Sequence, residues 1–193
     1  MRGPDTARRS TTARSAVPEQ GPHTGARAGG VRARIERFVD VIGAATSWIA
    51  LVIVALMATN VLLRYLFSAG TVWAQELEWH LLVPLILFGM SYALRHGEHV
   101  RVDIAYARFS GRTKVIVDLA SALLTVAISA LIIWLSLNYV EQSYVIDEGS
   151  PDPGGIPHRY LIKSLIPVGF ALLLLQGVAN VLGTVEKLRS RDS

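Results

Sequence analysis

The stretch that decides the fold is 119–140, LASALLTVAISALIIWLSLNYV, in which 22 consecutive residues carry no charge. Two further uncharged runs occur on either side of it, residues 41–63 and residues 164–185. About 20 apolar residues in a helix cross the roughly 30 Å of hydrocarbon in a bilayer. Each of the three runs therefore predicts a membrane-spanning helix.

A fourth uncharged run, residues 81–94, has 14 residues. As a helix it would reach only about 21 Å, which is too short to span alone. We predict that it recruits its N-terminal flank and spans as 76–95, with Glu76, Glu78 and His80 in its first turns. The alternative is a re-entrant or interfacial segment.

The predicted class is an all-α integral membrane protein with four transmembrane helices and short amphipathic or boundary segments. The predicted spans are 41–63, 76–95, 115–140 and 161–185. The pieces between them are too short to build a core of their own. We divide the chain into a disordered basic cytoplasmic tail (1–34), a four-helix membrane domain (35–187) and a second cytoplasmic tail (188–193).

Charge along the chain sets the expected orientation. Sixteen of the 19 lysines and arginines lie before the first span, in the 95–114 connection or after the last span. Positive residues accumulate on the cytoplasmic side of membrane proteins. The pattern predicts a multi-pass protein of the bacterial inner membrane with both termini in the cytoplasm.

Most of the net positive charge of the chain lies in its N-terminal tail. Residues 1–30 carry five arginines against two carboxylates, so a net charge of +1 is left for the rest of the chain. This is not the distributed basic surface of a nucleic-acid-binding protein.

The twin arginine at 8–9 is not read as an export signal. Such a signal needs a short apolar segment soon after the arginines, and none follows here. Translation from a downstream start is an alternative for this tail.

The predicted spans offer little chemistry. The chain has no cysteine, which excludes disulfides, thiol nucleophiles and cysteine-ligated metals. His96, Glu98 and His99 match no common zinc pattern, so we expect no metal site, no cofactor and no catalytic residue, and hence no enzyme. Neutral polar residues mark the first, third and fourth spans: Asn60, then Ser121, Thr125 and Ser129, then Gln176 and Asn180. We interpret these, with nearby glycines, as helix-packing stripes; a substrate path is the alternative.

The second span differs because it carries two carboxylates near one end. Glu76 and Glu78 are two residues apart, so they project from nearly opposite sides of a helix. We predict that one of these sides meets the first helix and the other meets water or a second protein; snorkelling to the headgroups is the alternative. We also predict that Glu76 pairs or shares a partner contact with Arg64, and that Pro84 and Pro167 kink their helices.

Two motifs then resemble a known family. The first is NVLLRYLF at 60–67 followed by WAQE at 73–76, and the second is RHGEHVRVD at 95–103. With the spacing between them, they resemble the small permease (DctQ-type) subunit of TRAP transporters, the tripartite ATP-independent periplasmic transporters. The resemblance covers roughly 35–187. The 152–160 loop departs from the common form of the family, and the arginine-rich tail lies outside it.

The resemblance implies a partner and a role. Small permease subunits pair with a large multi-span permease subunit, and a periplasmic binding protein delivers the solute, usually an organic acid. The small subunit is expected to serve as a static scaffold and to help dock the binding protein, with transport driven by an ion gradient. The alternatives are a standalone four-helix transporter and a haem or quinone membrane anchor. The candidate contact residues are Asn60, Arg64, Trp73, Glu76 and Glu78 at the outer boundary, and Arg95, Gly97, Glu98, His99, Arg101 and Asp103 at the inner one. We expect Arg95, Glu98, Arg101 and Asp103 to form an ionic cluster.

Overall fold

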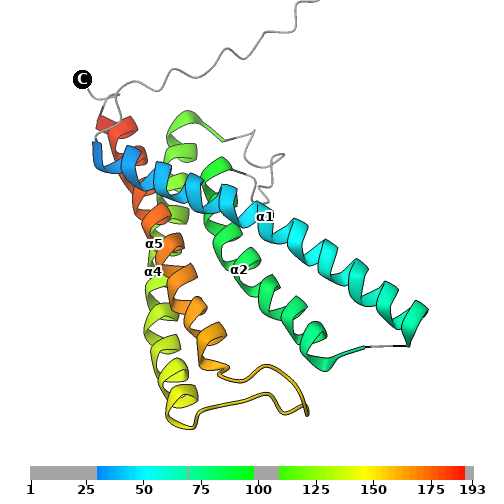
Figure 1. Cartoon of the computed structure of the whole chain (residues 1–193). Helices are drawn as coiled ribbons and strands as arrows, with labels where there is room; N and C mark the ends of the chain where they lie inside the picture. Colours follow the sequence, from blue (N-terminus) through cyan, green and yellow to red (C-terminus); the bar gives the residue numbers. More distant parts are fainter. Residues whose placement is uncertain (1–29, 69, 98–108, 190–193) are drawn as a thin grey trace, which may run out of the picture.

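A computed structural model describes residues 30–68, 70–97 and 109–189. Within these ranges the chain forms four helices, α1 (Gly30–Phe67), α2 (Val72–His96), α4 (Gly111–Val145) and α5 (Tyr160–Arg189) (Figure 1). All four are long and apolar enough to cross a membrane. The predicted class, all-α with four membrane-spanning helices, is confirmed.

The helices extend beyond the predicted spans at all of their ends. α1 begins at Gly30, so residues 30–34, which the sequence analysis assigned to the tail, are helical. The reason is that an uncharged run marks the part of a helix that lies in hydrocarbon, whereas the helix itself continues to the next stop signal. Gly97 supplies one such signal, because it ends α2 in the left-handed conformation (φ 72°) with its N–H donating to the carbonyl of Ala93. The rest of the predicted tail, residues 1–29, lies outside the described residues.

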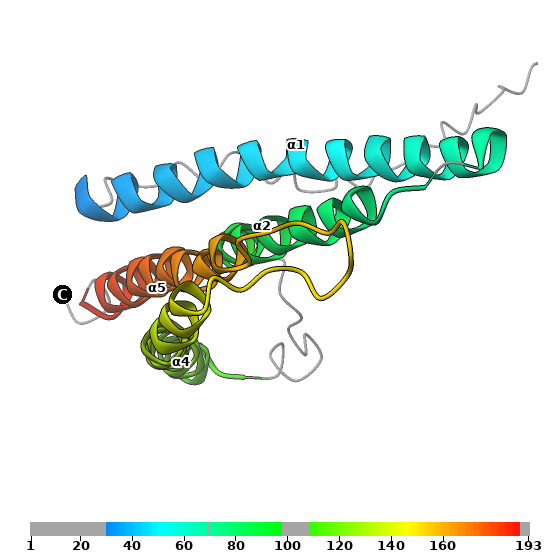
Figure 2. The ribbon, with the colours of Figure 1, turned by 60° about the horizontal axis from the view of Figure 1, so that its bottom comes forward.

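The helices form an open arrangement with α1 and α4 on opposite sides. α5 packs against α4, α2 and α1, and α2 packs against α1 and α5. Figure 2 shows α1 on one side, α4 on the other, and α2 with α5 between them. The first and last described helices meet at one end of the molecule, where α1 begins and α5 ends (Figure 1). This end also contains the end of α2 and the start of α4.

The buried residues of α4 and α1 recur every seven residues, and many of them are small or polar. On α4 the buried residues are Val115, Ala122, Ser129, Ser136 and Ser143, and on α1 they include Val39, Thr46, Ile53 and Asn60. A seven-residue repeat keeps one side of a helix in contact with a neighbour that crosses at a shallow angle. Burial of Ser129 agrees with the packing interpretation, which stays a prediction. Ser121 of the same stripe is exposed, and the buried serines continue from Ser129 toward the end of α4.

Glycines set the closest approaches between helices. A Cβ on Gly169 of α5 would lie 2.6 Å from Cβ of Leu87 on α2, and one on Gly43 of α1 would meet the ring of Tyr92. Small residues are used in this way where membrane helices must approach closely. Pro84 and Pro167 lie inside continuous helices; the kinks expected at them remain predictions.

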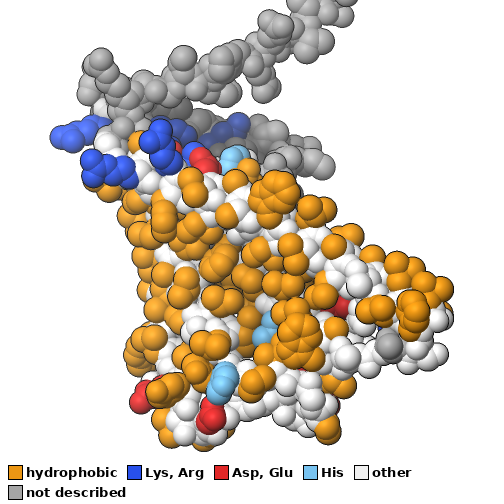
Figure 3. Space-filling model, viewed as in Figure 1, with side chains coloured by type: hydrophobic (Ala, Val, Ile, Leu, Met, Phe, Trp, Pro, Cys, Tyr) orange, Lys and Arg blue, Asp and Glu red, His pale blue; other side chains and the backbone are white. Residues whose placement is uncertain are grey.

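Large apolar side chains cover the outside of the molecule. Among them are Trp48, Trp134 and Tyr65, which are 66–82% exposed. In Figure 3 hydrophobic side chains cover most of the visible face, while lysines and arginines gather where α1 begins and α5 ends. An apolar exterior with charge at its ends fits a protein whose solvent is lipid.

Candidate functional site: two polar boundary clusters

The first polar cluster joins α1, α2 and α5 at the end where α1 begins. Nε of Arg95 on α2 lies 2.5 Å from Oδ1 of Asp40 on α1, and its Nη1 lies 3.6 Å from Oε2 of Glu36. Arg32 bonds Glu36 within α1 (2.8 Å) and reaches Glu186 on α5 (3.6 Å). We call Arg32, Glu36, Asp40, Arg95 and Glu186 the inner cluster. It links three helices through side chains alone.

Close packing brings the inner cluster together. Gly183 on α5 lies against the guanidinium of Arg32, since a Cβ there would be 2.7 Å from Cζ. Arg95 lies in an ionic cluster, as predicted, with Asp40 and Glu36 as its described partners. The expected partners Glu98, Arg101 and Asp103, like His99, lie outside the described residues. Glu36 and Asp40 were not among the predicted residues. The available signal was their spacing of four residues just before the first apolar run, which puts both carboxylates on neighbouring turns of one helix.

The second cluster, at the opposite end, centres on Glu76 of α2. Its carboxylate accepts hydrogen bonds from the hydroxyl of Ser150 and from the backbone N–H of Ile156 (2.5 Å for the latter). Both donors lie in the segment between α4 and α5, residues 146–159, which we call the outer loop. Gly155 allows this contact, because a Cβ there would lie 2.6 Å from Oε2 of Glu76. A single carboxylate thus holds the outer loop against α2.

The outer loop is also held against the start of α5. Lys163 on α5 donates a hydrogen bond to the carboxylate of Glu148, and within the loop the N–H of Arg159 donates to the backbone carbonyl of Glu148 (2.8 Å). The ammonium of Lys163 lies 4.0 Å from the centre of the Tyr139 ring on α4. Hydrogen bonding from Lys163, supported by the charge of Arg159, lowers the pKa of Glu148 against the opposing effect of burial. We call Glu76, Glu148, Ser150, Ile156 and Lys163 the outer cluster.

The expected pair between Arg64 and Glu76 is not formed. Glu76 is bonded by the outer loop instead, and Arg64 is exposed at the end of α1 with no ion pair to any residue that the structure describes. The direct pair was wrong because the helix ends were considered without the loop that returns between them. The alternative, a contact that the two residues share with a partner, stays a prediction. Glu76 and Glu78 do take different partners, however. Glu78 accepts a hydrogen bond from Nδ2 of Asn60 on α1 (3.2 Å), so one of the two sides meets the first helix as predicted.

The remaining boundary candidates in the described residues are an aromatic residue, Trp73, and the C-cap glycine of α2, Gly97. Trp73 is 51% exposed at the start of α2, and Gly97 ends that helix. Within the described ranges, no group of three or more histidine and carboxylate side chains is arranged to hold a metal. His96 stacks on Tyr92 with ring centroids 4.1 Å apart.

Between the two clusters the buried polar side chains are all neutral. Of the described residues, those polar and buried are Thr46, Asn60, Ser91, Ser129, Ser136, Ser143, Gln176 and Thr184. Nε2 of Gln176 donates to Oδ1 of Asn180 (3.0 Å), and Thr184 donates to the carbonyl of Asn180 (2.9 Å). The hydroxyls of Ser91 and Ser129 find no hydrogen-bond partner among the described residues. None of these buried side chains provides a charge to hold an ionic solute.

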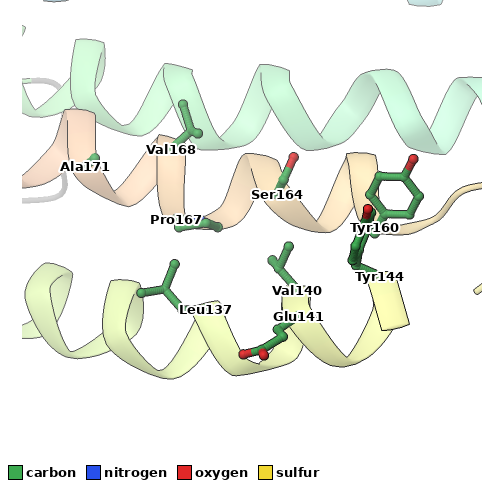
Figure 4. A pocket seen from close by; sticks show the side chains of 9 residues that line it. All are labelled: Leu137, Val140, Glu141, Tyr144, Tyr160, Ser164, Pro167, Val168 and Ala171. Atoms are coloured by element: carbon green, nitrogen blue, oxygen red, sulfur yellow. The ribbon is translucent and has the colours of Figure 1, made fainter. Parts of the chain in front are cut away.

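A groove between α4 and α5 lies near the outer cluster (Figure 4). Its volume is about 680 Å³, and its lining is mostly apolar. Glu141 is the charged side chain of the lining, and Figure 4 shows its carboxylate lying along α4 rather than toward α5. The lining consists of Leu137, Val140, Glu141, Tyr144, Tyr160, Ser164, Pro167, Val168 and Ala171. Such a surface suits an acyl chain or an apolar side chain better than an ion.

Comparison with known proteins agrees with this description. The model of the family described as "Tripartite ATP-independent periplasmic transporters, DctQ component" matches residues 53–187. The ectoine TRAP transporter small permease protein TeaB of Halomonas elongata is 28% identical over 144 residues, which cover 72% of each chain. Four membrane-spanning helices and this family indicate a multi-pass protein of the inner membrane. The chain belongs to the DctQ family and is a small permease subunit of a TRAP transporter.

Proposed function

We propose that this chain is the stationary small subunit of an importer driven by an ion gradient. In this proposal it braces a large multi-span permease subunit, which carries the transport site, and its outer end helps a periplasmic binding protein to dock. The solute is an organic acid or a related small molecule. Both termini lie in the cytoplasm, so the inner cluster faces the cytoplasm and the outer loop faces the periplasm.

The observation that carries the scaffold proposal is the distribution of charge. The buried polar side chains in the described part of the chain are hydroxyls and amides, while the ionic contacts lie in the two boundary clusters. A site for a charged solute within a membrane normally needs an ionisable or strongly oriented polar group at depth. A bundle whose buried polar groups carry no charge is suited to stay fixed while another subunit moves.

The positions of the two clusters also support the scaffold proposal, because they restrain the helices at both ends. The inner cluster ties α1 to α2 and α5, and the outer cluster ties the α4–α5 connection to α2. Contacts at both ends of a helix oppose its tilting, because tilting would separate at least one set of partners. This is the property that a static scaffold requires.

The experiment is uptake of solute into proteoliposomes with defined components. We expect uptake with this chain, the large permease and the binding protein together, and none with this chain alone. Uptake by the purified chain alone would overturn the proposal.

A second experiment tests assembly with the large permease. Arg64→Ala is compared with Arg112→Ala, which removes the same charge from an exposed position at the other end. We expect R64A to reduce co-isolation of the large permease more than R112A; equal yields would remove Arg64 from the contact.

Orientation can be tested independently. Because the chain has no cysteine, a single introduced thiol reports its own location. We expect a membrane-impermeant maleimide to label Asp152→Cys in intact cells and to label Arg112→Cys only after the membrane is opened. The reverse pattern would place the outer loop in the cytoplasm.

A further inference from the structure

The arginines at the start of α1 fall into two groups. Arg32 points into the inner cluster, where it bonds Glu36 and reaches Glu186. Glu36 and Asp40 are the two carboxylates in the first 11 residues of α1, and Arg32 and Arg95 already engage both of them. Arg34 and Arg37 are exposed and make no ion pair with any described residue.

Arg34 and Arg37 lie on the outward side of α1. At about 100° per residue they project nearly opposite to Val39, which is 1% exposed against the other helices. Apolar side chains are interleaved with them: Phe38 is 52% exposed and Val41 is 63% exposed. The outward side therefore carries two guanidinium groups that have no counter-charge among the residues the structure describes, next to exposed apolar side chains.

The position of this surface along α1 places it at the edge of the membrane. The uncharged part of α1 begins at Val41, and a helix rises about 1.5 Å per residue. Arg37 is thus about 6 Å outside the hydrocarbon edge and Arg34 about 10 Å outside it. The polar headgroup layer is about 5–7 Å thick on each side of the hydrocarbon. Extended arginine side chains at these two positions reach the level of the lipid phosphates.

We propose that Arg34 and Arg37, with Phe38 and Val41, form a binding surface for the headgroup of an anionic phospholipid. A guanidinium group donates two parallel hydrogen bonds to a phosphate, and the apolar side chains rest against the glycerol and upper acyl region. A membrane position favours lipid over an acidic protein patch, because phosphates are present at this depth along the whole leaflet. The surface lies outside the inner cluster, so it is independent of the scaffold role.

The test measures lipid retention by native mass spectrometry. The full chain, in the assembly in which it is isolated from membranes, is equilibrated in mild detergent with equal parts phosphatidylglycerol and phosphatidylcholine. We expect the parent to retain phosphatidylglycerol preferentially and the double variant Arg34→Gln/Arg37→Gln to lose roughly tenfold of this preference. The matched control Lys187→Gln/Arg189→Gln removes two charges from the same end and should change it less than about twofold.

The other outcomes are equally informative. Equal phosphatidylglycerol retention by the parent and the Arg34/Arg37 variant would overturn the proposal. So would loss of the large permease from the assembly with lipid retention unchanged, because that result would assign the two arginines to an acidic protein surface. Retained helix content and an unchanged unfolding temperature check that the variant is folded, as expected for exposed side chains outside the inner cluster.

Discussion

The two ends of the molecule are held together by different chemistry. At the inner end, charged side chains on three helices pair directly with one another, as Arg95 does with Asp40. At the outer end, one carboxylate on α2 binds a hydroxyl and a backbone N–H of a connecting segment. The inner contacts therefore fix helices relative to each other, whereas the outer contacts fix a loop on a helix. The difference indicates that damage to the inner end should spread through the bundle and damage to the outer end should stay local.

The largest expected effect comes from Arg95→Met, which keeps the length of the side chain and removes its charge. Asp40 would lose its cation, and Glu36 would keep only Arg32. Because Arg95 is 23% and Asp40 38% exposed, solvent screens part of the interaction, and we expect a loss of about 1–2 kcal/mol in the free energy of unfolding.

Thermal unfolding of the purified chain in detergent measures this loss, as a fall of roughly 2–8 °C in Tm. Arg64→Met is the control, since Arg64 is exposed and outside the ion pairs of the described chain. If the two variants have the same Tm, the inner cluster does not stabilise the helix arrangement.

The contrast between the ends also explains what the sequence could predict. Charge-free runs such as 119–140 locate helices because hydrocarbon excludes charge at every position, which is a local rule. The same rule does not locate the ends of a helix. α1 extends to Gly30 through five charged residues, and the partners of Arg32, Glu36 and Asp40 among them lie on α1 itself, α2 and α5.

Partners distant in sequence were the part that could not be predicted. Glu76 was correctly selected as an unusual carboxylate, but its donors Ser150 and Ile156 are 74 and 80 residues away. Their approach depends on how α4 and α5 pack and on the absence of a side chain at Gly155. Glu78 was more predictable, because its partner Asn60 is on the preceding helix and 18 residues away.

A smaller and local effect is expected from Glu76→Gln. Ser150 and the N–H of Ile156 bind different oxygens of the carboxylate, so in the amide one of them would face an NH2 group, which cannot accept a hydrogen bond. We expect amide hydrogen exchange in the outer loop to become roughly tenfold faster while exchange in α1 stays the same. Glu78→Gln is a closely matched control, since it is the same change two residues away on the other side of α2, and the Gln oxygen still accepts from Asn60. Faster exchange of the outer loop in E78Q would show that the two carboxylates do not act separately.

The smallest effect is a dependence on pH at the Glu148–Lys163 contact. The pKa of Glu148 lies below its ordinary value of 4.5 because Lys163 donates a hydrogen bond to the carboxylate. A lowered folded-state pKa adds stability that is complete above 4.5 and is lost as pH falls below 4.5 through the folded-state pKa. Hydrogen exchange in the outer loop, corrected for the intrinsic rate at each pH, should accelerate only in that acidic range. Glu148→Gln should accelerate exchange at neutral pH and reduce the additional acid effect. An acid response in E148Q as large as in the parent would assign the titration to another group, with Glu76 the next to test because it holds the same loop from the side of α2.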